Sequence, residues 1–221
     1  YSNTTGDTNT AVGKSALYSN TTGNYSTAVG YESQKNINST GWDNTNNVFN
    51  TSFGYQALLG NTSATCSINT AIGAYTLKNI VDGNNNIALG QYALEFLTSG
   101  DRNTALGYKS LWRNSTGDNN VAVGESALMN TTSSENTAIG FHALELNTGG
   151  TYNTAVGYES QKNLIVSSAD TSKGHNTSLG YQALMGASSG TGDQNTAIGS
   201  GPLLSITTGT NNIGIGVWAL K

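Results

Sequence analysis

The sequence predicts an all-β fold, a parallel β-solenoid (β-roll) with about 17 residues per rung. Three observations predict it: a recurring glycine, a fixed set of residue types around that glycine, and the absence of charge from the repeated segment. A fixed short period is the signature of stacked structural repeats. The glycine recurs at one rung's spacing, with occasional insertions, at twelve positions: Gly13, Gly30, Gly54, Gly73, Gly90, Gly107, Gly124, Gly140, Gly157, Gly180, Gly199 and Gly216.

The residues just before each glycine predict a short strand, as in Asn103-Thr104-Ala105-Leu106-Gly107. Four positions before the glycine stands Asn, with Ser26 the one exception; then come a β-branched, a small and a large apolar residue. β-branched residues favour strands, and successive strand side chains point to opposite faces. One face therefore carries the β-branched and large apolar residues, and the other carries Asn, the small residue and Gly.

Neither face of this strand is charged, so both faces should be covered. We expect the large apolar face to pack inside the coil, with the threonine methyl groups turned inward. We expect the small face, including Ala105 and Ala122, to meet neighbouring chains around a threefold axis. The Asn column should form hydrogen-bonded ladders between rungs, as stacked amides do. The Asn-x-Thr triplets, such as Asn20-Thr21-Thr22, then follow from the repeat and not from glycosylation.

After the glycine comes a second pattern, as in Gly54-Tyr55-Gln56-Ala57-Leu58. The fourth residue is Leu in ten copies, and Gln34 and Gln161 replace it in two. The Leu column predicts one continuous buried row. The apolar spacing of residues 91–97 would also fit a helical turn. Stacked strands lie about 4.8 Å apart and a helix is about 10 Å across, so we favour a short strand or irregular extended segment.

A longer repeat is superimposed on the rungs. The segments that begin at Gly30 and Gly157 share Gly-Tyr-Glu-Ser-Gln-Lys-Asn and lie seven rungs apart, and the three following glycines recur at the same spacing. Residues 1–221 are therefore interpreted as one continuous array of twelve rungs with a seven-rung higher-order repeat. Both ends fall within a rung, so we expect this chain to be a segment of a longer protein.

Composition excludes several classes of protein. The chain is 36% hydrophobic and 10% charged, with a net charge of −4, and it carries no basic stripe for nucleic acid. No apolar run reaches the roughly 18 residues that would predict membrane insertion. High glycine and low charge resemble disordered chains, but the regular apolar columns indicate a core formed by stacking.

No residue cluster predicts catalysis. Cys66 is the only cysteine, which indicates a free thiol, or alternatively a bond between chains. His142 and His175 fall in different rungs, and no cofactor or metal-ligand pattern accompanies them. The alternative of a polysaccharide-acting solenoid enzyme would need paired carboxylates, whereas the acidic residues are scattered. A third hypothesis, ice binding through the Thr column, has only one recurring Thr per strand.

Two long insertions are the candidate recognition loops, because loops on a rigid scaffold commonly carry binding residues. They follow Gln34 and Gln161, and we expect a local bulge in those rungs. The first insertion, residues 37–49, contains an aromatic residue suited to anchoring a partner; the second covers residues 164–175. The candidate residues are Trp42, Asp43, Asn44, Asp170, Lys173 and His175.

The repeat Asn-Thr-Ala-Val-Gly-x-x-Ala-Leu resembles the Asn-Ser-x-Ala-Ile-Gly-x-x-Ala repeat in the head domains of trimeric autotransporter adhesins. It is more similar to repeats in fibre and tail-fibre proteins of phages and large DNA viruses, and the resemblance covers essentially the whole chain. It implies a homotrimeric fibre, outside the cell or on a virion, that attaches to a host or cell-surface glycan or protein. The rung is longer here than in the adhesin heads.

Overall fold

The computed structural model describes residues 3–38, 48–61, 64–163, 174–186 and 192–220. It forms two compact units, Tyr1–Thr116 and Gly117–Lys221. The described residues contain strands, turns and bends but no helix, and each strand is three residues long. The predicted all-β parallel solenoid is confirmed.

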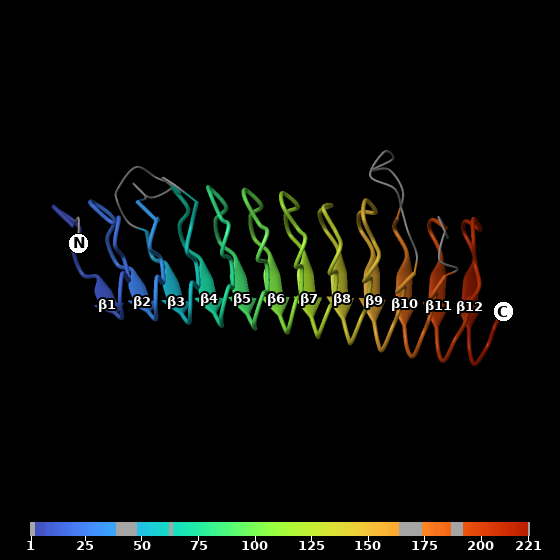
Figure 1. Ribbon diagram of the computed structural model, residues 1–221. Helices are drawn as coiled ribbons and strands as arrows, with labels where there is room; N and C mark the ends of the chain where they lie inside the picture. Colours follow the sequence, from blue (N-terminus) through green and yellow to red (C-terminus); the bar gives the residue numbers. More distant parts are fainter. Residues whose placement is uncertain (1–2, 39–47, 62–63, 164–173, 187–191, 221) are drawn as a thin grey trace. The chain divides into compact units, whose positions relative to one another are not determined.

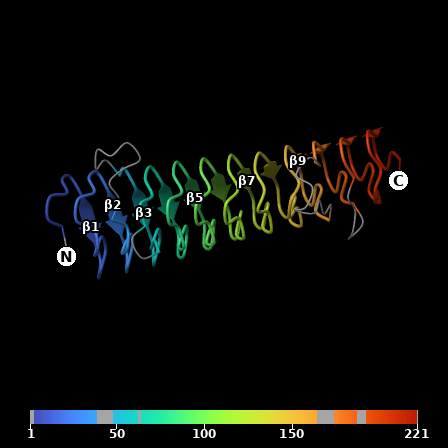
Figure 2. The ribbon, with the colours of Figure 1, turned by 90° about the horizontal axis from the view of Figure 1, so that it is seen from above.

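Each unit contains six parallel strands that pair in chain order (Figure 1). The pairing is in register, so that each strand position faces its equivalent in the next rung, as Ala71 faces Ala88; Figure 2 shows the same strands from a second direction. The first unit holds β1 (Thr10–Val12), β2 (Thr27–Val29), β3 (Thr51–Phe53), β4 (Thr70–Ile72), β5 (Ile87–Leu89) and β6 (Thr104–Leu106). The second holds β7 (Val121–Val123), β8 (Thr137–Ile139), β9 (Thr154–Val156), β10 (Thr177–Leu179), β11 (Thr196–Ile198) and β12 (Ile213–Ile215).

The two strand faces have the predicted composition, but the predicted direction was wrong. The small residues point into the coil and are buried from β2 to β12, Ala105 and Ala122 included, whereas Ala11 of β1 is exposed. The large apolar residues and the threonines point outward, and Phe53 is 59% exposed. The reason is that the Leu column already fills the interior. A Cβ added at Gly214, in the small column, would lie 3.0 Å from Cγ of Leu203, so only a small side chain fits beneath each Leu.

The Leu column is buried as predicted except in the last rung, where Leu220 is 64% exposed. Leu17 packs with Ala28 of the next rung, and Leu184 packs with Ala197 in the same way. Burying a Leu side chain contributes roughly 1.5–3 kcal/mol, so the stacked Leu–Ala pairs supply much of the apolar core. The fully buried members include Leu58, Leu77, Leu94, Leu111, Leu128 and Leu184.

The segment after each glycine is a series of turns and not an extended strand. The second and fourth residues after the glycine have positive φ, as in Gln56 (φ 51) and Leu58 (φ 52). Their amides bond in opposite directions: Gln56 N donates to Tyr31 O of the preceding rung, and Leu58 N donates to Thr76 O of the following one. These bonds between rungs offset the left-handed conformation, which L residues disfavour.

The recurring glycine is required by both conformation and space. Gly90 has a φ of 127°, which residues with a Cβ rarely adopt, and an added Cβ would lie 2.6 Å from the carbonyl oxygen of Gly107. The turns of neighbouring rungs therefore approach each other backbone to backbone at this column.

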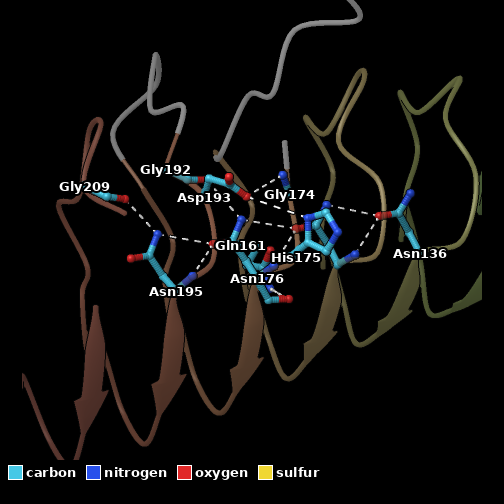
Figure 3. Close-up of polar contacts among 10 residues, drawn as sticks. Asn136, Gln161, Gly174, His175, Asn176, Gly192, Asp193, Asn195 and Gly209 are labelled. Carbon is cyan, nitrogen blue, oxygen red and sulfur yellow. Dashed lines mark hydrogen bonds and ion pairs between the residues drawn. The ribbon is translucent and has the colours of Figure 1, made fainter. Parts of the chain in front are cut away.

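The predicted Asn ladders are present in both units. In the first, Asn69 Oδ1 accepts from the backbone N–H of Asn86 at 2.9 Å, and Asn69 Nδ2 donates to Gly83 O. The second unit repeats this arrangement along Asn136, Asn176 and Asn195 (Figure 3). Each buried amide thus bonds to the backbone of other rungs, which satisfies polar groups that would be costly to bury alone.

Candidate functional site

A row of exposed or half-buried aromatic side chains lies along the turn that follows the glycine column, and we call it the aromatic column. Its rings come from the first or second residue after the glycine. Neighbouring ring centroids are 5.2–6.0 Å apart in the first unit and 5.3–5.4 Å apart in the second, in stacked or edge-on geometry. The members are Tyr31, Tyr55, Tyr75, Tyr92 and Tyr108 in the first unit, and Phe141, Tyr158 and Tyr181 in the second.

A pocket lies beside the aromatic column, in the turns that follow β5 and β6. This pocket, which we call the Trp112 pocket, is lined by Tyr92, Glu95, Tyr108, Lys109 and Trp112 and has a volume of about 220 Å³. Its charged groups are held against its rings. Trp112 Nε1 donates to Glu95 Oε2 at 2.8 Å, and Lys109 Nζ lies 5.0 Å from the Trp112 ring centroid.

The strand segment contributes a second outward surface. Each rung places one large apolar residue on this surface, either exposed or half-buried, and Leu179 in the second unit is 50% exposed. Contiguous exposed apolar surface marks interaction sites more often than isolated exposed residues do. The Ala face, which was predicted to meet neighbouring chains, is therefore enclosed by the coil, and the large apolar residues form the outward strand face.

Of the candidate loop residues, the structure describes one. Trp42, Asp43, Asn44, Asp170 and Lys173 lie outside the described residues.

His175 lies where the second insertion rejoins its rung (Figure 3). Its ring stacks on that of Tyr152 with centroids 5.0 Å apart, and its side chain is 43% exposed. Its Nδ1 is 3.9 Å from Asp193 Oδ1, which also accepts the backbone N–H of Gly174. Asp193 and Tyr152 thus position His175 on the surface.

The predicted bulge at Gln34 and Gln161 was wrong, because both side chains are fully buried in the Leu column. Gln161 Nε2 donates to Thr154 O at 2.9 Å and to Ser178 Oγ at 2.8 Å, and Ser178 stands where most rungs have Ala. Gln34 bonds to Thr27 O and Ser52 Oγ in the same way.

A Gln–Ser pair therefore replaces the Leu–Ala pair in these two rungs. The signal was present in the sequence, since each Gln is followed one rung later by Ser in the small column. Among the described side chains, the Oε1 atoms of Gln34 and Gln161 are buried without a hydrogen-bond partner.

Each of these two rungs has an equivalent Lys–Glu ion pair on its outer surface. Lys35 Nζ lies 2.8 Å from Glu32 Oε1, and Lys162 Nζ lies 2.7 Å from Glu159 Oε1. The hydrogen bond from each lysine, followed by one from Gln56 or Gln182, lowers the pKa of the partner carboxyl. These carboxyls are therefore held ionised.

The structure also brings together side chains that appeared scattered in the sequence. Lys162 Nζ lies 3.7 Å from Glu145 Oε2, and the same oxygen bonds to His142 Nδ1 at 2.5 Å. Glu145 and Glu159 thus share one lysine. A glycosidase acid needs a raised pKa, whereas that of Glu159 is lowered by its hydrogen bond from Lys162, so Glu159 does not fit the role of the acid.

Cys66 is a free thiol buried in the first unit, as predicted, and burial raises its pKa to about 12. A fully buried thiol is not placed to form the alternative bond between chains. In the described part of the chain, no group of three His, Cys, Asp or Glu residues could hold a metal ion. No helix in that part is long and apolar enough to cross a membrane.

These features define a parallel β-solenoid repeat protein with outward apolar and aromatic surfaces. Comparisons with protein-family models, with curated proteins and with solved structures found no match for this chain.

Proposed function

We propose that this chain is part of a homotrimeric structural fibre shaft that attaches to surfaces. The observation that carries this proposal is the outward strand face, on which successive rungs expose large apolar side chains such as Phe53 and Leu179. Apolar surface of this kind is stabilised when another chain covers it. The proposed number of chains in the fibre, three, is inferred from the resemblance to trimeric fibre repeats.

The proposed location is extracellular, on a cell surface or on a virion. The proposed partners are two further copies of the chain and a host or cell-surface glycan or protein. The exposed aromatic column supports an attachment role, since Tyr and Trp supply large contact area with a polar group for recognition.

Assembly is tested by sedimentation and electron microscopy of the purified chain. We expect a trimer in elongated particles, and Phe53→Lys should lower the oligomer fraction while circular dichroism stays unchanged. Phe53→Leu is the matched control, because it keeps the apolar surface. Ala105→Lys should instead abolish folding, since it places a charge inside the coil. A folded monomer of the unaltered chain at micromolar concentration would refute the proposal.

Ice binding is the second candidate, because the Thr column points outward and not inward as expected. Thr10 and Thr51 are exposed. However, Ile87, Val121 and Ile213 interrupt the hydroxyl row, and a large apolar residue accompanies each Thr. A thermal-hysteresis assay separates the two functions, since a fibre shaft gives no hysteresis.

A further inference from the structure

We propose that the Trp112 pocket binds one neutral hexopyranose residue of a polysaccharide or glycan. The proposal deepens the attachment function and rests on it for biological meaning. Its physical basis is the geometry of five side chains in the first unit.

The pocket differs from the rest of the aromatic column by having aromatic walls on two sides. Tyr92 and Tyr108 come from the column itself, with ring centroids 6.0 Å apart and edge-on. Trp112 comes from the turn beyond the Leu column, and Phe96 supports its ring edge-on at 5.2 Å. Side chains from two rungs and two columns thus enclose one space. Rings that are supported in this way lose little conformational freedom when a ligand stacks on them, which favours binding.

The polar groups of the pocket are fixed in place. Trp112 Nε1 bonds to Glu95 Oε2, which uses one of the two carboxylate oxygens and orients the group. A carboxylate accepts several hydrogen bonds, and the Lys109 ammonium has three N–H donors. The pocket therefore offers an acceptor and a donor beside aromatic faces. A pyranose matches this arrangement, because it presents C–H groups on its faces and hydroxyls at its edge.

Charged ligands fit less well. A cationic ligand would be repelled by two protein cations beside these rings: Lys109 Nζ lies 5.2 Å from the Tyr108 ring centroid, and Arg113 Cζ lies 5.3 Å from that of Trp112. An anionic ligand would meet the Glu95 carboxylate at the pocket wall. A neutral ring with several hydroxyls avoids both costs.

The size of the pocket limits the ligand to a small unit. Its volume of about 220 Å³ lies below the roughly 300–1,000 Å³ of pockets for drug-sized molecules. One sugar ring should enter, and further residues of an oligosaccharide would extend over the neighbouring rings of the first unit, such as Tyr75.

The test is isothermal titration of the purified full chain with cellohexaose, mannohexaose and chitohexaose, and with hexagalacturonate as the acidic probe. We expect at least one neutral probe to bind and Trp112→Ala to weaken it at least about tenfold. Glu95→Gln and Lys109→Met should each weaken it several-fold, and these two variants keep the test valid if Trp112→Ala does not fold. Tyr181→Ala is the matched control, since it removes an exposed ring of the same column outside the pocket, and it should change affinity less than twofold.

Three outcomes would overturn the proposal: no probe binds, hexagalacturonate binds more tightly than every neutral probe, or Tyr181→Ala weakens binding as much as Trp112→Ala. Sedimentation and electron microscopy of the same sample distinguish these failures from failure of the fibre proposal. An assembled fibre that binds no neutral probe refutes only the pocket assignment.

Discussion

Replacing a buried Gln–Ser pair by the Leu–Ala pair of other rungs should stabilise the second unit. Gln161 Oε1 is buried without a hydrogen-bond partner, and an unsatisfied buried acceptor costs about 1–3 kcal/mol. The double variant Gln161→Leu/Ser178→Ala removes this acceptor together with the two groups bonded to each other, and Ser160 Oγ keeps its bond to Ala183 O. We therefore expect it to be more stable than the unaltered chain by about 1–3 kcal/mol.

The single variant Ser178→Ala should have the opposite effect. It removes one acceptor of Gln161 Nε2, which keeps its 2.9 Å bond to Thr154 O, and one of the two partners of Ser160 Oγ, which keeps its bond to Ala183 O. The cost should be about 1–2 kcal/mol. The two substitutions are therefore coupled, and the double variant should be more stable than the sum of the singles predicts.

Guanidinium denaturation followed by circular dichroism measures all three variants. The matched control is the reverse exchange, Leu184→Gln/Ala197→Ser, at a pair that has the usual Leu and Ala. This control should lower the stability of the chain. A double variant at Gln161 and Ser178 less stable than the unaltered chain would refute the reasoning. It would mean that Gln161 Oε1 has a favourable partner, such as a buried water.

Three further predictions follow from the rung geometry. Leu94→Ala should cost about 2–5 kcal/mol because Leu94 is fully buried, whereas the half-exposed Leu179→Ala should cost far less; denaturation curves compare them. Gly90→Ala should destabilise strongly because its Cβ would meet Gly107 O at 2.6 Å, while Ser99→Ala at an exposed turn should not, as thermal melts would show. The pKa of Cys66 is raised from 9.0 to about 12, so the neutral thiol favours folding and this stability is lost as pH rises from 9 towards 12. A Cys66→Ala variant should lack that part of the pH dependence, and iodoacetamide should alkylate the thiol only after unfolding; rapid labelling of the folded chain would contradict its burial.

The period and residue types sufficed to predict the strands, the Leu row and the Asn ladders, because each rung repeats the same local chemistry. Periodicity alone did not decide which strand face points inward, since both faces lack charge. The interior volume decides it: Leu203 reaches the small column of the next rung, so Gly214 and its equivalents must lie inside. This constraint depends on the width of the coil, which the sequence pattern does not express.

The candidate site was predicted only in part, because it depends on contacts across rungs. Trp112 and Glu95 lie one full rung apart in the chain, as do Tyr108 and Tyr92, so each pair meets only when the rungs stack. The register could have revealed this, since Trp112 and Glu95 both stand at the fifth position after their glycines. The insertions, which composition and length favour as recognition loops, contain one described candidate, His175.

The rungs that carry the long insertions are alike both inside and outside. Inside, Gln34 and Gln161 each bond to a Ser of the next rung; outside, Glu32 and Glu159 each bond to a Lys and a Gln. If the stacking shifted by one rung, the buried Gln would face the Leu and Ala of a neighbouring rung, and its side-chain amide would have fewer hydrogen-bond partners. A Gln–Ser pair therefore disfavours such a shift. In an array of otherwise similar rungs, a buried polar pair of this kind can fix which rung stacks on which, as single polar residues do in coiled coils. We infer that each pair sets the register of the rung from which an insertion departs, so that the insertion begins at a defined place while its own sequence remains free to vary.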